Sequence, residues 1–533
     1  MLHLSEQSES LWQEIPKINY SPLTEDLDCD VCIVGGGITG LTVAYHCLQQ
    51  GHRVVVIDRD QMAAHETAHT SAHLSNALDD TYQTLRKMHG MNGMRLAYDS
   101  HTQAIDRIEE IVFENSIDCD FQRVSGYLFL DAETPRNFLE KELTCVHEAG
   151  GENVELFENA QPGSFQLGPA LHYPRQAQFH PLKYTFGLAQ AVERLGGKIF
   201  AQTPAVGIRG GKEARVKTSR GNVIRCQSIV VATNTPVNDV VTMHTKIAAY
   251  RSYLIAVRLK KNWLEPALLW DTASPYHYIR SINRENGEQI LLIGGADHRT
   301  GQAAHPEDRY NDLRAWTRDF LMHEPEIIAK WSGQIIEPVD ALGYIGRNPG
   351  DAENVFIVTG DSGHGLTHGT IAGIMLPDLI EKKTHAWQEL YDPSRLKIRG
   401  LEQYVEENFR TARQYSDWLS SGDVDSTADI SCGHGAVIRN GLNKIAAYRD
   451  EHGILHTFSA VCPHLKGLVH WNEAESTWDC PCHGSRFTRT GKVLNGPAIE
   501  GLSPVETGET QRPQLIESQT PPPPPFSPGL DFT

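Results

Sequence analysis

The alternation of apolar and polar residues near the N-terminus predicts a strand, a helix and a second strand in direct succession. Residues 30–60, DVCIVGGGITGLTVAYHCLQQGHRVVVIDRD, open with an apolar strand and close with the strand-forming run HRVVVID. Between these two strands, apolar residues recur at helical spacing over residues 41–50. This order predicts an α/β domain built on a parallel sheet.

Later segments continue the same kind of pattern. Residues 221–238 predict a hairpin strand that ends at Val231, and residues 250–259, YRSYLIAVRL, predict an apolar strand. Residues 354–380 predict a strand ending at Gly360, a glycine-rich loop and an apolar helix that begins near Thr367. Residues 435–463 alternate short strands with glycine turns, which is typical of a small β-barrel domain.

A chain of 533 residues is too long for one compact core and suggests two to four domains. We predict an N-terminal extension over 1–28, with Trp12 as a candidate anchor, and a dinucleotide-binding domain over 29–395. A helical linker over 396–428 and a C-terminal domain over 429–510 follow. Residues 511–533 contain PPPPPFSPG and are expected to be disordered.

Composition narrows the class of protein. Hydrophobic residues make up 40 % of the chain, yet no window approaches eighteen consecutive apolar residues, so we expect no membrane span. The N-terminal segment lacks a basic start and an apolar core, so we expect no signal peptide. A net charge of −19 disfavours a nucleic-acid partner. Seven of the ten cysteines are scattered singly, which favours a reducing, cytoplasmic location.

The strand–helix–strand unit carries a dinucleotide fingerprint, Gly35-x-Gly37-x-x-Gly40. The first glycine permits a tight turn, the second lets the backbone approach a pyrophosphate, and the third lets the helix pack on the strand. The helix N-terminus offers free N–H groups to the phosphates. Asp58 ends the second strand, where a carboxylate can bind ribose hydroxyl groups.

Five segments carry a family resemblance: the Gly35 fingerprint, the segment from His180, the VVATN strand, LLIGGADHRTG from Leu291 and the Gly360 loop. In these segments the chain resembles FAD-dependent oxidoreductases of the D-amino-acid-oxidase and glycine-oxidase type. The resemblance covers roughly residues 28–395 and implies an α/β FAD-binding domain of the Rossmann-like, glutathione-reductase type with an inserted α+β antiparallel-sheet substrate domain. It also implies FAD contacts from Thr70, Ser71, Val206, Ala232, Gly360, Gly363, Gly365, Leu366 and Thr367.

The stretch HETAHTSAHLS, residues 65–75, contains H-E-x-x-H, the helix motif of zinc proteases. Here the motif interrupts a dinucleotide-binding unit, which leaves no catalytic domain of its own. In the resembled family this position is a hydroxyl-rich loop and helix beneath the flavin. We therefore expect His65 and His69 to make local contacts and His73 to lie nearer the flavin.

A second motif, CPHLKGLVHWNEAESTWDCPCHGSRF, supplies Cys462-x-His464 and Cys480-x-x-His483. A Rieske [2Fe–2S] cluster needs two cysteines on one iron and two histidines on the other. A structural zinc ion could use the same four ligands. The residues CPCHGSRF and TGKVLNGPA resemble Rieske domains, which favours the cluster and implies an all-β C-terminal domain.

Two departures from Rieske relatives limit what can be carried over. In the respiratory branch, a cysteine five positions after the first ligand pairs with the middle cysteine of C-P-C-H; here that position is Gly467, so Cys482 is expected to be a free thiol. Rieske oxygenases add a mononuclear iron site downstream of the cluster. No histidine follows His483 in this sequence, which excludes that arrangement.

The two motifs together predict an oxidoreductase that contains FAD and an iron–sulfur cluster. The resemblance implies oxidation of an amino acid or N-substituted amine, with electrons passing singly to an unidentified protein acceptor. Tyr278 and Arg280 alternate on one strand and are candidates for binding a substrate carboxylate, although a structural cross-strand pair explains them equally well. Two alternatives stay open: reduction of a substrate by electrons that enter through the cluster, and a redox-sensing module.

Overall fold

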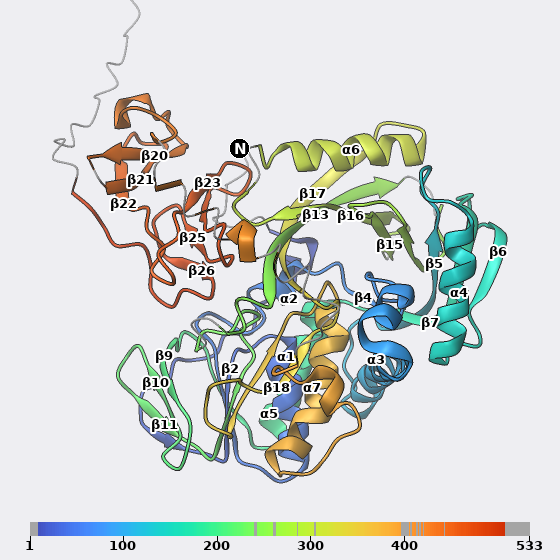
Figure 1. The fold of residues 1–533 in the computed structure, drawn as a ribbon, viewed down its shortest axis with the longest axis horizontal. Helices are drawn as coiled ribbons and strands as arrows, with labels where there is room; N and C mark the ends of the chain where they lie inside the picture. The colour runs from blue at the N-terminus through green and yellow to red at the C-terminus, as the bar shows by residue number, and fades with distance from the viewer. Residues whose placement is uncertain are drawn as a thin grey trace, which may run out of the picture.

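The computed structural model describes residues 9–238, 242–259, 263–284, 286–302, 305–395, 421–441 and 443–506, with a few residues between 405 and 418. Seventeen of the 33 residues of the predicted linker 396–428 lie outside the described residues, and the predicted tail 511–533 lies entirely outside them. None of the helices in the described part has the length and apolar character needed to cross a membrane. Figure 1 shows two packed α/β and sheet-rich bodies with a smaller β domain at one side.

A six-stranded sheet forms the centre of the first domain, in the order β18-β19-β12-β2-β3-β8. Its strands are β2 (Val31–Val34), β3 (Val54–Ile57), β8 (Lys198–Phe200), β12 (Ser228–Val231), β18 (Tyr344–Arg347) and β19 (Val355–Thr359). All neighbours pair parallel except β18 with β19. Alternate side chains of β2 point to opposite faces of the sheet: Val31 and Ile33 pack against helices, whereas Cys32 and Val34 face a smaller sheet.

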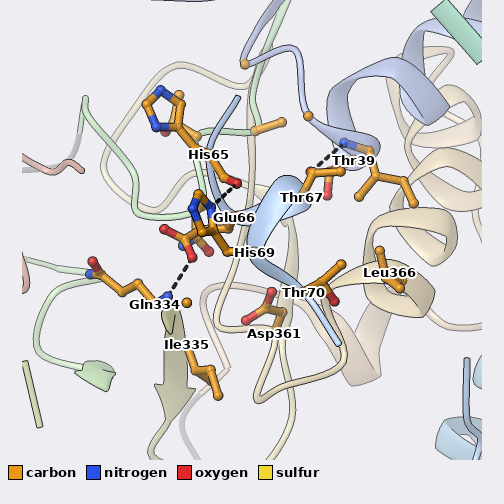
Figure 2. Close-up of a pocket in the computed structure, with 18 of the residues that line it drawn as sticks. Thr39, His65, Glu66, Thr67, His69, Thr70, Gln334, Ile335, Asp361 and Leu366 are labelled. Carbon is orange, nitrogen blue, oxygen red and sulfur yellow. Dashed lines mark hydrogen bonds between the residues drawn. The ribbon is translucent and has the colours of Figure 1, made fainter. Parts of the chain in front are cut away.

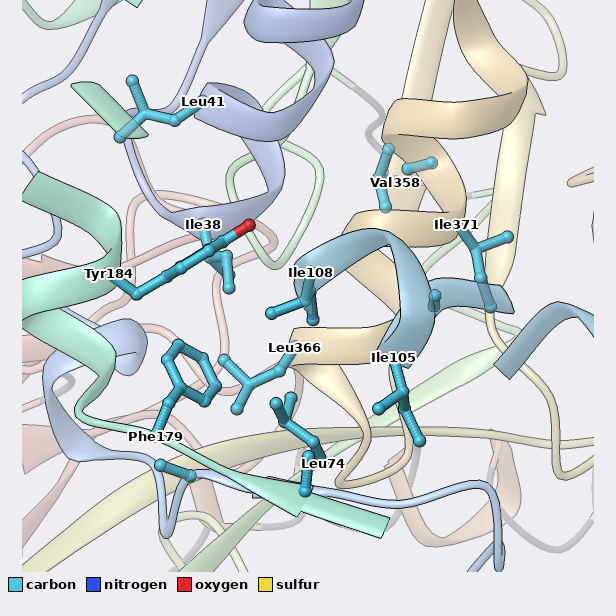
Figure 3. Close-up of a cluster of buried hydrophobic side chains, with 14 of the residues drawn as sticks. Ile38, Leu41, Leu74, Ile105, Ile108, Phe179, Tyr184, Val358, Leu366 and Ile371 are labelled. Carbon is cyan, nitrogen blue, oxygen red and sulfur yellow. The ribbon is translucent and has the colours of Figure 1, made fainter. Parts of the chain in front are cut away.

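Helices cover one face of this sheet, as Figure 3 shows for the apolar cluster between them. They are α1 (Ile38–Gln49), α3 (Tyr82–Glu114), α5 (Pro181–Arg194), α7 (Gly365–Ile380) and the short α8 (Gln388–Tyr391). The other face is covered by β1 (Leu27–Asp28), β9 (Ala205–Arg209), β10 (Arg215–Thr218) and β11 (Val223–Arg225). This layering confirms the α/β FAD-binding fold that the sequence predicts.

The inserted domain is a long, mainly antiparallel sheet ordered β17-β13-β16-β15-β14-β5-β7-β4, with β6 paired to β7. Its strands are β4 (His73–Leu74), β5 (Gln122–Phe129), β6 (Glu155–Ala160), β7 (Gly168–Gln178), β13 (Ile247–Leu259), β14 (Ala267–Asp271), β15 (Tyr278–Asn283), β16 (Gln289–Arg299) and β17 (Glu326–Pro338). Helix α6 (Asp308–Leu321) packs on the outer face of the sheet, and α4 (Asn137–Ala149) contacts β6 and β7. The inner face turns toward the first domain.

The C-terminal domain consists of two small antiparallel sheets after the short helix η4 (Thr427–Asp429). One sheet contains β20 (Gly435–Asn440), β21 (Asn443–Arg449) and β22 (Leu455–Ser459). The other contains β23 (His470–Asn472), β24 (Thr477–Asp479), β25 (Arg486–Thr488) and β26 (Val493–Asn495). Trp478 and Phe487 are fully buried in the core between the sheets.

The N-terminal segment is held by Trp12 in the short helix η1 (Leu11–Glu14). The Trp12 side chain is 3 % exposed, and its indole N–H donates to the carbonyl of Thr70 at 2.7 Å. Its ring also meets the edge of His180, with 5.1 Å between centroids. These contacts attach residues 9–20 to the segment that follows β3.

Candidate functional site

A cavity opens at the carboxyl ends of the parallel strands, where ligands bind in open α/β sheets. The ends of β2, β3, β12 and β19 line it through Gly35, Asp58, Ala232 and Thr359. The cavity continues beneath the inner face of the inserted sheet, where β13, β15 and β17 contribute further residues. One elongated space thus joins the fingerprint to the inserted domain.

The first and third fingerprint glycines leave no room for side chains. Gly35 has φ of +114°, and a Cβ there would lie 2.3 Å from the carbonyl oxygen of Ala232. A Cβ on Gly40 would lie 1.9 Å from the carbonyl oxygen of Gly35, so this glycine lets α1 pack against the turn and does not line the cavity. Gly37 is the N-cap of α1 and lines the cavity beside the helix N-terminus.

Asp58 is fixed by the backbone at the end of β3. Its carboxylate accepts hydrogen bonds from the N–H groups of Gly36 at 2.6 Å and Asp60 at 2.8 Å. Burial raises the pKa of Asp58, opposed by these N–H donors and neighbouring positive groups. The side chain is therefore oriented toward the first part of the cavity, where a ribose would lie beside the fingerprint.

The H-E-x-x-H stretch forms the single-turn helix α2 (Glu66–His69), which Figure 2 shows along the cavity wall. His65 contacts Asp60 at 2.7 Å, and Nδ1 of His69 lies 2.8 Å from the carbonyl oxygen of His65. Glu66 accepts hydrogen bonds from the Gln334 N–H at 2.5 Å and from the Asn495 amide at 2.7 Å. Among the described residues, no third His, Cys, Asp or Glu completes a single-metal site with His65 and His69.

Hydroxyl residues of the same stretch face the cavity, as the sequence suggests. Thr67, Thr70 and Ser71 line it, and the Thr67 hydroxyl accepts the N–H of Ile38 at the start of α1 at 3.2 Å. His73, in strand β4, also lines the cavity, and its ring lies 5.6 Å from the Tyr278 ring, measured between centroids. Small polar groups therefore follow the length of the cavity.

The late glycine loop reaches the cavity in part. Gly363, Gly365 and Leu366 line it at the N-terminus of α7, where free N–H groups face inward. Gly360 and Thr367 are not among the lining residues: the Thr367 hydroxyl lies 2.8 Å from Nδ1 of His101 instead. Val206 also lies off the wall, whereas its neighbours Pro204 and Ala205 belong to it.

Tyr278 and Arg280 have different surroundings although they share a face of β15. Tyr278 lines the cavity, and its hydroxyl lies 2.9 Å from that of Ser252. Arg280 is not a lining residue; its Nη1 donates to the carbonyls of Ser71, Ala72 and Phe179. The structure thus places Tyr278 at the cavity and Arg280 behind its wall.

Several cavity residues escaped the sequence analysis because no motif marks them. Asp79 accepts a hydrogen bond from the Tyr276 hydroxyl at 2.6 Å and lies 3.4 Å from Nε2 of His364. Ser252 and Trp270 complete this end of the cavity with Tyr278. Tyr276 stands two residues before Tyr278 in SPYHYIRS, which is the one sequence signal that could have found it.

The four predicted cluster ligands come together on two loops of the C-terminal domain. Each loop has the same backbone pattern: Cys462 N–H donates to Gly467 and Cys480 N–H donates to Ser485, each at 2.8 Å. The thiols of Cys462 and Cys480 lie beside each other, and both are buried. The cysteines thus form one adjacent pair.

The two histidines form the second pair. The rings of His464 and His483 lie 5.2 Å apart, measured between centroids, at right angles. Because the ligands are arranged as a thiol pair and an imidazole pair, they fit two irons bridged by sulfide, with one pair on each iron. A Cβ on Gly467 would lie 2.5 Å from Sγ of Cys482, so the loops close tightly around the cysteines.

A third histidine approaches this pair from the first domain. His244 lies in a turn between β12 and β13, and its ring is 4.7 Å from that of His464 and 5.4 Å from that of His483, measured between centroids. His244 is 5 % exposed. The histidine edge of the cluster loops therefore faces the flavin-binding part of the chain, a contact that no sequence motif indicates.

The C-terminal domain is joined to the inserted sheet by buried polar contacts. Glu475 forms ion pairs with Arg251 of β13, at 2.6 Å, and with Arg486 of its own domain. Gln334 of β17 lines the cavity, and its side-chain amide donates to the carbonyl of Gly484 in the second cluster loop at 3.0 Å. The carbonyl of Leu494 accepts from Arg59 at 2.6 Å, and Asn495 lines the cavity itself.

Comparison with known proteins agrees with both sites. Residues 30–379 match the family model described as FAD dependent oxidoreductase, and residues 420–507 match the Rieske [2Fe-2S] domain model. The chain belongs to this FAD-dependent oxidoreductase family and carries a C-terminal Rieske domain. It is therefore an enzyme that uses FAD and a [2Fe–2S] cluster, and the observed glycine cradle and paired ligands fit those groups.

Particular relatives share one or both parts. YhfW of Bacillus subtilis (strain 168), described as a Rieske 2Fe-2S iron–sulfur protein, is 33 % identical over 94 % of this chain and 98 % of its own length. Gamma-glutamylputrescine oxidoreductase of Escherichia coli (strain K12) is 24 % identical over 68 % of this chain and 85 % of its own. Glycine oxidase from Geobacillus kaustophilus has a TM-score of 0.57 at 18 % identity, covering 69 % of this chain and 99 % of that one.

Proposed function

We propose that the protein oxidises an amine or amino acid by hydride transfer to FAD and passes the electrons singly through the Rieske cluster to an external acceptor protein. The observation that carries the electron route is the docking of the cluster loops on the first two domains. Gln334 contacts both the cavity and the Gly484 loop, and His244 contacts both cluster histidines. A cluster held against the flavin-binding part is suited to receive electrons from it.

The assignment of residues follows the geometry. Gly35, Gly37, the α1 N-terminus and Asp58 would hold the adenosine and pyrophosphate part of FAD. Gly363, Gly365 and Leu366 at the start of α7 would meet the flavin part. Cys462 and Cys480 would bind one iron, and His464 and His483 the other.

Bound FAD accepts two electrons as a hydride, whereas a Rieske cluster accepts one electron at a time. The protein contributes position and exclusion of water. The inserted sheet roofs the cavity, Tyr278 and Ser252 face into it, and the C-terminal domain closes the fingerprint end through Asn495. The names of the relatives, an oxidoreductase of gamma-glutamylputrescine and a glycine oxidase, support nitrogen-containing substrates.

Anaerobic incubation with a panel of amines and amino acids tests this proposal, with the FAD absorbance and the cluster EPR signal as readouts. We expect at least one compound to bleach the FAD absorbance and produce the Rieske signal. Reduction by dithionite alone, with no response to any panel compound, would contradict substrate oxidation at the flavin. FAD bleaching with no EPR signal would contradict the route through the cluster.

A further inference from the structure

The inner end of the cavity combines a carboxylate with aromatic rings. Asp79 keeps 26 % of its side chain accessible, and both it and the rings of Tyr276, Tyr278 and Trp270 line the cavity. The rings of Tyr276 and Tyr278 lie 5.7 Å apart between centroids, and the Tyr276 hydroxyl holds the Asp79 carboxylate at 2.6 Å. We call Asp79, Tyr276, Tyr278 and Trp270 the acidic wall.

Asp79 is the ionised acid of this wall. Although burial would raise the pKa of Asp79, His364 and the Tyr276 hydroxyl hold it below its ordinary value. Although burial would lower the pKa of His364, the Asp79 charge raises it, and Nε2 of His364 lies 3.4 Å from the Asp79 carboxylate. Beyond this imidazole, the Asp79 carboxylate meets no guanidinium or ammonium group among the described cavity-lining residues.

The described residues around the wall place no Arg or Lys side chain beside Asp79. Among the cavity-lining residues in the described part of the chain, Arg59 is the one Arg or Lys, and it contacts Leu494 near the fingerprint end. Burial lowers the pKa of His73 to about 3, which keeps its ring neutral. Arg280 is directed at three backbone carbonyls behind the wall.

A second layer behind the wall is also acidic. Asp297 is hydrogen-bonded to Ser252, and burial raises its pKa to about 7. A substrate carboxylate at this end would meet the Asp79 carboxylate and find no guanidinium or ammonium partner in the described wall. An ammonium group would instead gain a carboxylate and aromatic faces, the combination that recognises organic cations.

We propose that the acidic wall binds an ammonium group and that the substrate is an amine without a carboxylate, with an alkyl diamine as the best-fitting class. This inference rests on the proposed function. One nitrogen of the diamine is protonated and lies at Asp79 and the aromatic rings. The other nitrogen is neutral and carries the lone pair that hydride loss requires. Oxidation breaks a C–H bond beside that nitrogen, sends the hydride to FAD and releases one N–H proton. Water then converts the imine to an aldehyde and ammonia.

Matched substrate pairs test the inference in the unmodified holoenzyme. Each diamine is compared with the amino acid that differs only by a carboxylate: 1,4-diaminobutane with ornithine, and 1,5-diaminopentane with lysine. We expect the diamines to bleach the FAD absorbance anaerobically and the amino acids to react at least about tenfold more slowly, a difference of about 1.4 kcal/mol. Amino acids that react as fast as the diamines would overturn the inference while leaving the proposed function standing.

Binding measured by calorimetry on Asp79→Asn gives an independent readout. We expect the Kd of 1,4-diaminobutane to rise at least about tenfold, with Asp26→Asn, an exposed carboxylate paired with Arg225, as the matched control. An unchanged Kd in a flavin-loaded Asp79→Asn protein would overturn the inference. Diamine binding that depends on Asp79, without FAD reduction, would uphold recognition by the wall and contradict the proposed direction of electron flow.

Discussion

At the scale of single residues, Arg280 is a candidate substrate contact by sequence, but in the structure it supports the wall of the cavity. Its side chain is 4 % exposed, and its guanidinium lies 5.3 Å from the Trp12 ring centroid. By binding the carbonyls of Ser71 and Ala72, it supports the hydroxyl-rich segment that faces the cavity. The residue type fitted a carboxylate ligand, but only the three-dimensional neighbours show where its donors point.

Replacing Arg280 should therefore lower the stability of the fold more than it changes the preference among substrates. We predict that Arg280→Met lowers the free energy of unfolding by about 2–4 kcal/mol, because three backbone carbonyls, two of them in buried hydrogen bonds, lose this donor. Thermal unfolding and FAD content are the measurements. Arg284→Met, in an exposed pair with Glu14 just after the same strand, is the control. A selective rise in KM for carboxylate substrates, with stability intact, would restore Arg280 as a carboxylate ligand.

Gly467 is a second residue whose surroundings yield a prediction. Cys482 is a free, buried thiol, and a Cβ at Gly467 would lie 2.5 Å from its Sγ. Disulfides join Cβ atoms about 3.8 Å apart, which a small shift of the loop would provide. We predict that Gly467→Cys forms a disulfide with Cys482 in air, detected by peptide mass spectrometry.

The matched variant Gly467→Ala adds the same Cβ without a thiol. We expect it to lower the iron content, because the Cβ also approaches Sγ of Cys480 to 3.3 Å. A Gly467→Cys protein with all thiols free after oxidation, or a Gly467→Ala protein with full iron content, would show that the loops are less tightly closed than the structure indicates.

At the scale of elements, the sequence predicts those parts whose local pattern determines their structure. The fingerprint with α1, the apolar strand β13 and the glycine loop before α7 all lie where residue spacing places them. The α2 segment lines the cavity, and its position directly after β3 together with the family resemblance is what indicated this. Asp79 and His244 could not be predicted, since their roles depend on packing between segments far apart in the chain.

The turn between β12 and β13 makes the contact to the cluster, and His244 is its contacting side chain. We predict that His244→Ala slows electron transfer from flavin to cluster roughly tenfold, or about 1.4 kcal/mol in activation free energy, and shifts the EPR g-values of the cluster. Iron content should stay unchanged, since the four ligands remain. Thr242→Ala, exposed on the same turn, is the control. Unaltered transfer and EPR spectra in His244→Ala would remove this turn from the electron route.

At the scale of the whole molecule, Glu475 links the Rieske domain to the inserted sheet. Although burial alone would raise the pKa of Glu475, Arg251 and Arg486 hold it at about 2, below the ordinary value of 4.5. A lowered folded-state pKa stabilises the protein above the unfolded-state pKa, and this stabilisation disappears as pH falls from about 4.5 to about 2.

We therefore predict that Glu475→Gln lowers the free energy of unfolding by about 3 kcal/mol at pH 7, because two buried arginines lose their carboxylate. The difference from the unmodified protein should shrink as pH falls below about 4.5, measured by urea unfolding across that range. Glu451→Gln, an exposed partner of Arg489 in the same domain, should show little change. A pH-independent difference would contradict the ionic role of Glu475.

The central claim is that electrons pass within one molecule from the flavin to the docked cluster. Stopped-flow absorbance of the FAD and rapid-freeze EPR of the cluster, recorded after mixing with a reducing substrate over a range of protein concentrations, test it most directly. The account predicts that the EPR signal follows flavin bleaching at a rate independent of protein concentration. A rate proportional to protein concentration, or a cluster that stays oxidised beside reduced flavin, would contradict it.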